Sequence, residues 1–186
     1  MKWASVVVAM FTIGTLSAGA QTVTTFHCIS TKVQTSSGKE ENVFATVARR
    51  GNRQTPPMIL WRTTLGKFTP QERCKVVSDR LTEVVAQNNG KLSNLYLTYG
   101  RVDGEAVICH VPDKNGACNR RNMLFTLRPQ DKGNEKKILE QMVSFSVTGT
   151  GSAVQQSGEQ FYAAFGEEAE KMLETTAAST STPSGI

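Results

Sequence analysis

Two pairs of adjacent residues set a histidine beside a cysteine, His27-Cys28 and Cys109-His110, and the second pair is followed nine residues after its cysteine by Cys118. These residue types could form a Cys/His catalytic pair, a metal site or a disulfide. Adjacent side chains of a strand point to opposite faces, so a thiolate and an imidazole cannot come within hydrogen-bond reach. A metal drawing on both pairs would need all four side chains on one face. We therefore expect no catalytic residue and no metal at these positions.

The four cysteines, Cys28, Cys74, Cys109 and Cys118, are better explained as two disulfides. Their spacings contain no C-x-x-C pair of the structural zinc type. The turn-rich segment 111–117 can bring Cys109 and Cys118 together, which leaves Cys28 for Cys74. Four cysteines allow three pairings. The pairing of Cys28 with Cys74 and of Cys109 with Cys118 is favoured because Cys74 falls on the apolar stripe of a predicted helix that packs on a sheet.

The start of the chain has the pattern of a secretory leader. Lys2 precedes an apolar stretch over 6–16, and Ala18-Gly19-Ala20 is a small-x-small cleavage site. We predict a signal peptide over 1–20, because the apolar stretch is shorter than the roughly 20 residues of a membrane span. The alternative is an uncleaved anchor helix. The protein is then exported, to the periplasm or the extracellular space, where disulfides persist.

The central part of the chain predicts one α+β domain over 21–146. Thr69, Pro70 and Glu72 form a capping box at the start of a helix over 70–88, and Asn134 caps a second helix. Six segments have strand patterns: 22–31, 42–49, 57–61, 94–102, 105–110 and 122–129. The expected fold is a small, mainly antiparallel sheet with two packed helices, stapled by disulfides.

The C-terminal part changes composition. Small and polar residues over 147–158 indicate a linker, and 159–174 has the pattern of an amphipathic helix. The remainder, 175–186, is rich in Thr, Ser and Ala and is predicted to be a disordered tail.

Charge is unevenly distributed along the chain, whose formal net charge is +5. Arg49, Arg50 and Arg53 cluster in a predicted loop, and Arg120 and Arg121 follow Cys118, so these five arginines are the candidate anion-binding residues. Export argues against nucleic acid as the natural partner, and an anionic membrane surface or an acidic envelope protein fits better. The alternatives are a solvated face with no ligand, or the glutamate-rich segment after Ser157 folding back onto the basic body.

No catalytic or cofactor motif is present. The chain lacks G-x-S-x-G, H-E-x-x-H, a P-loop and a dinucleotide fingerprint. Its best-placed carboxylates, Glu72 and Asp103, are explained by a helix cap and a turn. We expect a non-enzymatic binding or envelope-associated module without a cofactor. The alternative is a secreted enzyme or thiol redox protein of an unrecognised class, although no C-x-x-C motif supports redox activity.

Five short motifs carry a family resemblance. They are TFHC (25–28), MILW (58–61), FTPQERC (68–74), VDGEAVIC (102–109) and MLFTL (123–127). In this order they resemble the circadian oscillating protein family of cyanobacteria, over about residues 24–145. The resemblance implies an exported or membrane-peripheral protein whose abundance follows the daily cycle. It implies no known catalytic activity, transfers no active-site residue and fits the four cysteines as structural elements.

Overall fold

The computed structural model describes residues 22–35, 37–144 and 160–180. The leader predicted over 1–20 and the linker predicted over 147–158 lie outside the described residues, so both stay predictions. None of the helices in the described part is long and apolar enough to span a membrane.

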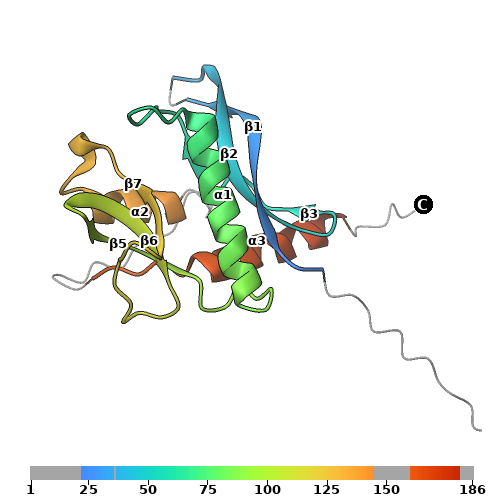
Figure 1. Cartoon of the computed structure of the whole chain (residues 1–186). Helices are drawn as coiled ribbons and strands as arrows, with labels where there is room; N and C mark the ends of the chain where they lie inside the picture. Colours follow the sequence, from blue (N-terminus) through green and yellow to red (C-terminus); the bar gives the residue numbers. More distant parts are fainter. Residues whose placement is uncertain (1–21, 36, 145–159, 181–186) are drawn as a thin grey trace, which may run out of the picture.

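The first sheet is organised around a long hairpin (Figure 1). β1 (Thr25–Gln34) pairs with β2 (Glu40–Arg50) in antiparallel register, and both β3 (Arg53–Gln54) and β4 (Ile59–Trp61) also pair with β2. The predicted hairpin is confirmed. β3 lies within the segment that the sequence predicts as a basic loop, because two residues are too few to carry a period-2 pattern.

The second sheet contains three antiparallel strands, β5 (Tyr96–Val102), β6 (Glu105–Val111) and β7 (Met123–Thr126). Asp103 and Gly104 connect β5 to β6 with φ angles of 53° and 83°. Positive φ at both central residues is the geometry of a two-residue type I′ turn, which an Asp-Gly pair favours. The strands thus form two sheets, where the sequence predicts one, because alternation alone does not say which strands pair.

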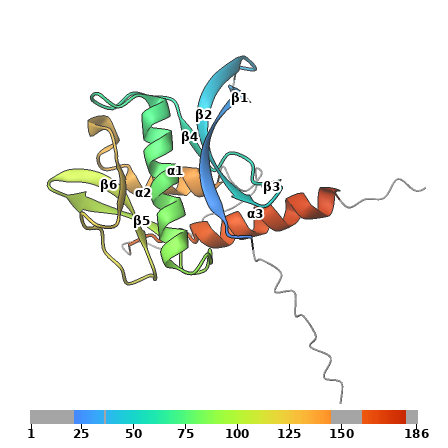
Figure 2. The ribbon, with the colours of Figure 1, turned by 45° about the vertical axis from the view of Figure 1, so that its right-hand side comes forward.

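Helix α1 (Pro70–Gln87) lies between the two sheets, as Figures 1 and 2 both show. Its start is fixed by the predicted capping box: Thr69 Oγ1 accepts the Glu72 N–H at 3.2 Å, and the Glu72 carboxylate accepts the Thr69 N–H at 2.8 Å. Its buried face packs on β1, β2, β4 and β7. That face consists of Cys74, Val77, Ser78, Leu81 and Val85.

Two further helices complete the fold. α2 (Glu135–Ser144) packs on β5 and β6, after a short 3₁₀ helix over Pro129–Asp131. α3 (Phe165–Thr180) packs against β2, β3 and β5 and lies beside the first sheet in Figure 2. The sequence predicts this helix over 159–174 and a disordered tail over 175–186. The helix starts six residues later and continues to Thr180, and the rest of the predicted tail lies outside the described residues.

One contiguous core takes residues from both sheets and from all three α-helices. Phe26 of β1 stacks on Phe165 of α3, with ring centroids 6.0 Å apart. Trp61 of β4 meets Phe125 of β7 edge to face at 5.2 Å, so the two sheets contact each other directly. The predicted α+β class is confirmed, with a third helix included in the packed domain.

Candidate functional site

Both predicted disulfides are present. Cys28–Cys74 joins β1 to α1, and Cys109–Cys118 joins β6 to the loop that follows it. Their Cα–Cα distances, 5.5 and 5.6 Å, lie in the ordinary range. Cys74 lies on the buried face of α1, which is turned towards the first sheet. No cysteine is free, so none of the four can act as a thiolate in this state.

The two histidines have structural surroundings. The His27 Nε2 lies 2.8 Å from Thr25 Oγ1, and His110 is partly buried beside α1. Burial is the main cause that lowers the pKa of both imidazoles, opposed at His110 by the carboxylate of Glu83. Within the part of the chain that the structure describes, no group of three or more His, Cys, Asp or Glu side chains is arranged to hold a metal ion.

The two carboxylates that the sequence singles out are engaged as predicted. Hydrogen bonds from Thr69 lower the pKa of Glu72. The Asp103 carboxylate accepts two hydrogen bonds from Arg120, at 2.7 and 2.8 Å, and this contact lowers its pKa. Glu72 therefore caps α1, and Asp103 combines its turn position with an ion pair that occupies one of the five candidate anion-binding arginines.

The other candidate arginines separate into two places. Arg49, Arg50 and Arg53 lie together on the β2–β3 hairpin, which we call the basic hairpin, while Arg121 stays beside Arg120 in the loop before β7. Arg49 donates to the Gln54 side chain at 2.7 Å. In the described part of the chain, Arg49, Arg53 and Arg121 make no ion pair with a carboxylate.

Arg50 binds the C-terminal helix. Its guanidinium forms a two-pronged ion pair with the Glu170 carboxylate on α3, and its Nε donates to Thr24 Oγ1 at 2.7 Å. Hydrogen bonding to Glu170 raises the pKa of Arg50, and the same contact lowers the pKa of Glu170. The acidic C-terminal segment thus folds back onto the basic body, one of the alternatives raised by the sequence.

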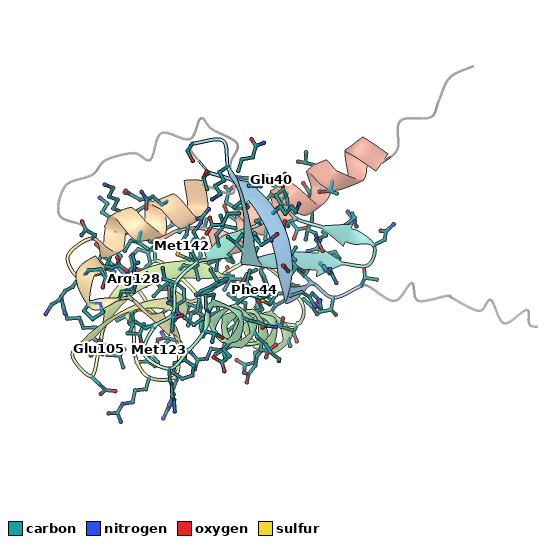
Figure 3. The ribbon with its side chains drawn as sticks, turned by 90° about the horizontal axis from the view of Figure 1, so that it is seen from above. Glu40, Phe44, Glu105, Met123, Arg128 and Met142 are labelled. Carbon is teal, nitrogen blue, oxygen red and sulfur yellow. A yellow bond between two sulfur atoms is a disulfide. The ribbon has the colours of Figure 1, made fainter. Side chains whose placement is uncertain are left out.

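An open groove of about 830 Å³ lies where the two sheets meet. We call it the inter-sheet groove. Its walls are formed by Met58 and β4, by part of segment 125–131 and by α2. Two of its lining residues, Arg128 and Met142, are labelled in Figure 3. Its apolar side chains are Met58, Ile59, Leu60, Trp61, Phe125, Leu127, Ile138 and Met142. Trp61 is held in place by a hydrogen bond from its Nε1 to Thr46 Oγ1 at 3.0 Å.

Arg73 of α1 extends into this groove. Its guanidinium lies 5.2 Å from the centre of the Trp61 ring and 6.0 Å from that of Phe125, within reach of cation–π attraction. It donates to the carbonyl of Thr63, after β4, and to that of Thr126, on β7, both at 3.2 Å. Burial lowers its pKa from the ordinary arginine value, and it remains a cation. Arg73 therefore links the two sheets as a half-buried positive charge.

Arg73 differs from the other two arginines of the groove in its partners. Arg128 pairs with Asp131 through two hydrogen bonds of 2.7 and 2.8 Å, and Arg62 pairs with Glu41 at 3.0 Å. No carboxylate of the described residues lies within ion-pair distance of Arg73. The polar end of the groove consequently holds two arginines, Arg73 and Arg128, against one carboxylate.

A second groove of about 590 Å³ follows α1 and β7 on the other side of Arg73. It shares Arg73, Phe125 and Leu127 with the inter-sheet groove, and Figure 3 labels Glu105 and Met123 at this second groove. Phe68, which is 48 % exposed, lies on its rim. The apolar surface on both sides is thus continuous around one arginine.

Neither groove can be predicted from the sequence. Arg73 falls on the polar side of the helical pattern, which predicts a solvated residue. Its aromatic neighbours belong to two strands that the sequence does not place beside it. One signal was available. MILW, FTPQERC and MLFTL, three motifs of the family resemblance, contain Trp61, Arg73 and Phe125, so the motifs meet in space at this groove.

Comparison with protein-family models identifies a family. The family model described as circadian oscillating protein COP23 matches residues 25–171. The match extends past residue 145, where the resemblance read from the sequence ends, and reaches into α3. No curated protein and no solved structure matches the chain.

Proposed function

Given that the chain belongs to the circadian oscillating protein COP23 family, we propose that it is an exported, non-enzymatic binding protein whose ligand occupies the inter-sheet groove. Membership of this family suggests a role of the circadian oscillating kind, in which the amount of protein, and with it the binding capacity, follows the daily cycle.

The observation that carries the proposal is the groove itself. Small-molecule sites are concave, mostly apolar, about 300–1,000 Å³ in volume and fitted with a few polar groups. The inter-sheet groove has about 830 Å³, a wall of aromatic and aliphatic side chains and one half-buried guanidinium. Arg73, which bonds to both walls, and a core shared by both sheets hold the walls in a fixed relation, which limits the ordering cost of binding.

The oxidation state of the cysteines supports export. Both cysteine pairs are oxidised, and disulfides persist in oxidising compartments such as the periplasm or the extracellular space. The N-terminal leader pattern points the same way.

The test uses a neutral, polarity-sensitive dye, Nile red, and the full mature chain with its disulfides intact. Ile138 of α2 lines the groove, packs on the edge of the core and is partly exposed, so the larger indole of Ile138→Trp should extend into the site. Lys137→Trp adds the same indole at the exposed neighbouring position of the same helix, outside the groove. We expect the wild type and Lys137→Trp to enhance dye fluorescence saturably and Ile138→Trp to lose the enhancement.

Equal dye binding by all three proteins, with melting temperatures unchanged, would remove the groove as the site. Absence of dye binding to the wild type would reject the proposal as a whole.

The second candidate function is attachment to an anionic membrane surface or an acidic envelope protein through the basic hairpin. Arg49 and Arg53 favour it because neither forms an ion pair within the described residues, and each basic residue near an anionic surface contributes about 1 kcal/mol. Arg50 contributes less to this surface because Glu170 neutralises it.

Co-sedimentation with phosphatidylglycerol vesicles at low salt tests this candidate. Arg49→Gln with Arg53→Gln should abolish sedimentation, and Glu170→Gln, which releases Arg50, should increase it. Protein that stays in the supernatant at low salt would leave the basic hairpin as a solvated face.

A further inference from the structure

Among the residues that the structure describes, the positive charge at the polar end of the inter-sheet groove is not fully balanced. Arg128 and Asp131 form two hydrogen bonds, and Asp131 also attracts Arg73 from beyond ion-pair distance, so one carboxylate faces two arginines and a net positive charge of one remains. Keeping a half-buried charge without a counter-ion is costly, and buried charges in proteins are normally paired. The neighbouring aromatic rings and two carbonyls reduce this cost without cancelling the charge.

The geometry of Arg73 leaves it able to bind an anion. A guanidinium has five N–H donors in a fixed plane, and the described residues accept two hydrogen bonds from it, one each at Nη1 and Nη2. Its Cζ atom lies 5.2 Å from the centre of the Trp61 ring, and its hydrogen bonds to the carbonyls of Thr63 and Thr126 restrict its rotation. Such a pre-organised guanidinium matches a carboxylate, which can accept two parallel N–H bonds.

The rest of the groove suits an unbranched apolar chain. From Arg73 the lining continues over Trp61 and Phe125 to Ile138 and Met142 of α2. Apolar surface buried here contributes about 25 cal/mol per Å², and the groove is open enough for a chain to enter from the side without a change in the fold.

We propose that the inter-sheet groove binds a single-chain fatty carboxylate, with its carboxylate on Arg73 and its alkyl chain over Trp61 and Phe125 towards α2. This inference rests on the proposed function and names the ligand class of the same site. A neutral lipid would leave the net positive charge at Arg73 unbalanced, and a small anion would leave the partly exposed side chains of Leu60, Ile138 and Met142 in contact with water.

The experiment titrates the mature protein with cis-parinaric acid and, separately, with its methyl ester, following probe fluorescence. The two probes share one polyene chain and differ in the negative charge and in the methyl group of the ester. We expect the wild type to bind the acid at least about tenfold more tightly than the ester, because a hydrogen-bonded charge pair is lost with the ester. Arg73→Met keeps an apolar stem and should reduce the difference to about twofold or less.

Asp131→Asn provides a variant whose effect has the opposite sign. It removes the carboxylate that offsets the groove's positive charge, so affinity for the acid should rise by about two- to fivefold while affinity for the ester stays constant. This result does not depend on whether Arg73→Met folds well. Arg49→Met, on the basic hairpin, is the matched control and should change neither affinity.

Three results would overturn the inference. Equal binding of the acid and the ester to the wild type would mean that the groove binds apolar ligands such as Nile red but has no carboxylate site. Unchanged acid affinity in Asp131→Asn would show that this end of the groove does not sense the anion. Binding to phosphatidylglycerol vesicles that is lost in Arg73→Met, without binding of the free acid, would assign the Arg73 charge to a membrane headgroup instead.

Discussion

At the scale of single residues, Gly100 shows how closely the second disulfide packs on its sheet. A Cβ added to Gly100 on β5 would lie 2.9 Å from the Cβ of Cys118 and 3.0 Å from its Sγ. Real Cβ atoms essentially never approach this closely, so Cys118 would have to move, and Cys109 on the adjacent strand holds it by the disulfide.

Gly100→Ala should therefore destabilise the oxidised protein by about 1–3 kcal/mol, the usual cost of overpacking. In a background in which Cys109 and Cys118 are both serine, the same change should cost less because the loop can yield. Urea denaturation of the four proteins measures both values. An equal cost in both backgrounds would contradict the role given to the disulfide.

The partly buried His110 makes stability depend on pH. Burial lowers the pKa of the folded imidazole below the 6.5 of the unfolded chain. Between these two values the unfolded state binds more protons, so the free energy of unfolding falls as the pH drops below 6.5, by at most about 1.4 kcal/mol per pH unit for one proton. His110→Gln should flatten this slope.

Denaturation midpoints at several values between about pH 7 and pH 5 measure the slope, a range in which histidine is the side chain that titrates. The His27 imidazole also has a lowered pKa, and His27→Gln serves as the comparison. A slope that survives in both variants would have to come from another group.

At the scale of secondary structure elements, α3 depends on one glycine. Gly166 lies in the first turn of α3, its N–H donates to the Leu95 carbonyl at 2.9 Å, and a Cβ on it would lie 1.8 Å from the Leu92 carbonyl oxygen. Backbone atoms cannot move aside as a flexible side chain does. Gly166→Ala should lift the start of α3 and weaken its contact between Glu170 and Arg50.

We expect this change to cost at least the upper end of the usual 1–3 kcal/mol for overpacking, and to speed proteolysis within 160–180. Glu167→Ala, the next residue on the same helix and exposed to solvent, is the matched control. Cleavage at the wild-type rate in Gly166→Ala would mean that α3 tolerates the displacement.

Elements with strong local signals could be predicted, and those fixed by distant contacts could not. Thr69, Pro70 and Glu72 define the start of α1 in one short motif, and Asp103-Gly104 defines the turn between β5 and β6. The start of α3 at Phe165 is set by its packing on Phe26 and by the bridge between Ala163 and Leu97, which no local pattern encodes.

At the scale of the whole molecule, the same distinction separates the disulfides from the groove. Cys74 lies on a recognisable apolar stripe and Cys109 beside a turn-rich loop, so their pairing could be predicted. The groove arises because Trp61 of the first sheet meets Phe125 of the second, and the sequence alone does not separate the strands into two sheets. Of the five arginines proposed from their clustering, Arg50 and Arg120 pair with carboxylates, whereas Arg73 belongs to no arginine cluster in the sequence.

The final prediction concerns the mature state of the molecule. Two disulfides tie α1 to the first sheet and the loop to the second, and in the chain-entropy model they contribute roughly 4 and 3 kcal/mol. A domain that relies on them should fold after export. Intact mass of the protein recovered from its native compartment should show a chain beginning at Gln21, and a thiol reagent applied without reductant should label no cysteine. Serine in place of Cys28 and Cys74 should lower the melting temperature more than serine in place of Cys109 and Cys118, because the longer loop restricts the unfolded chain more. A native protein that retains Met1 would contradict cleavage and indicate a membrane anchor. Reactive thiols in the native protein would contradict the oxidised state.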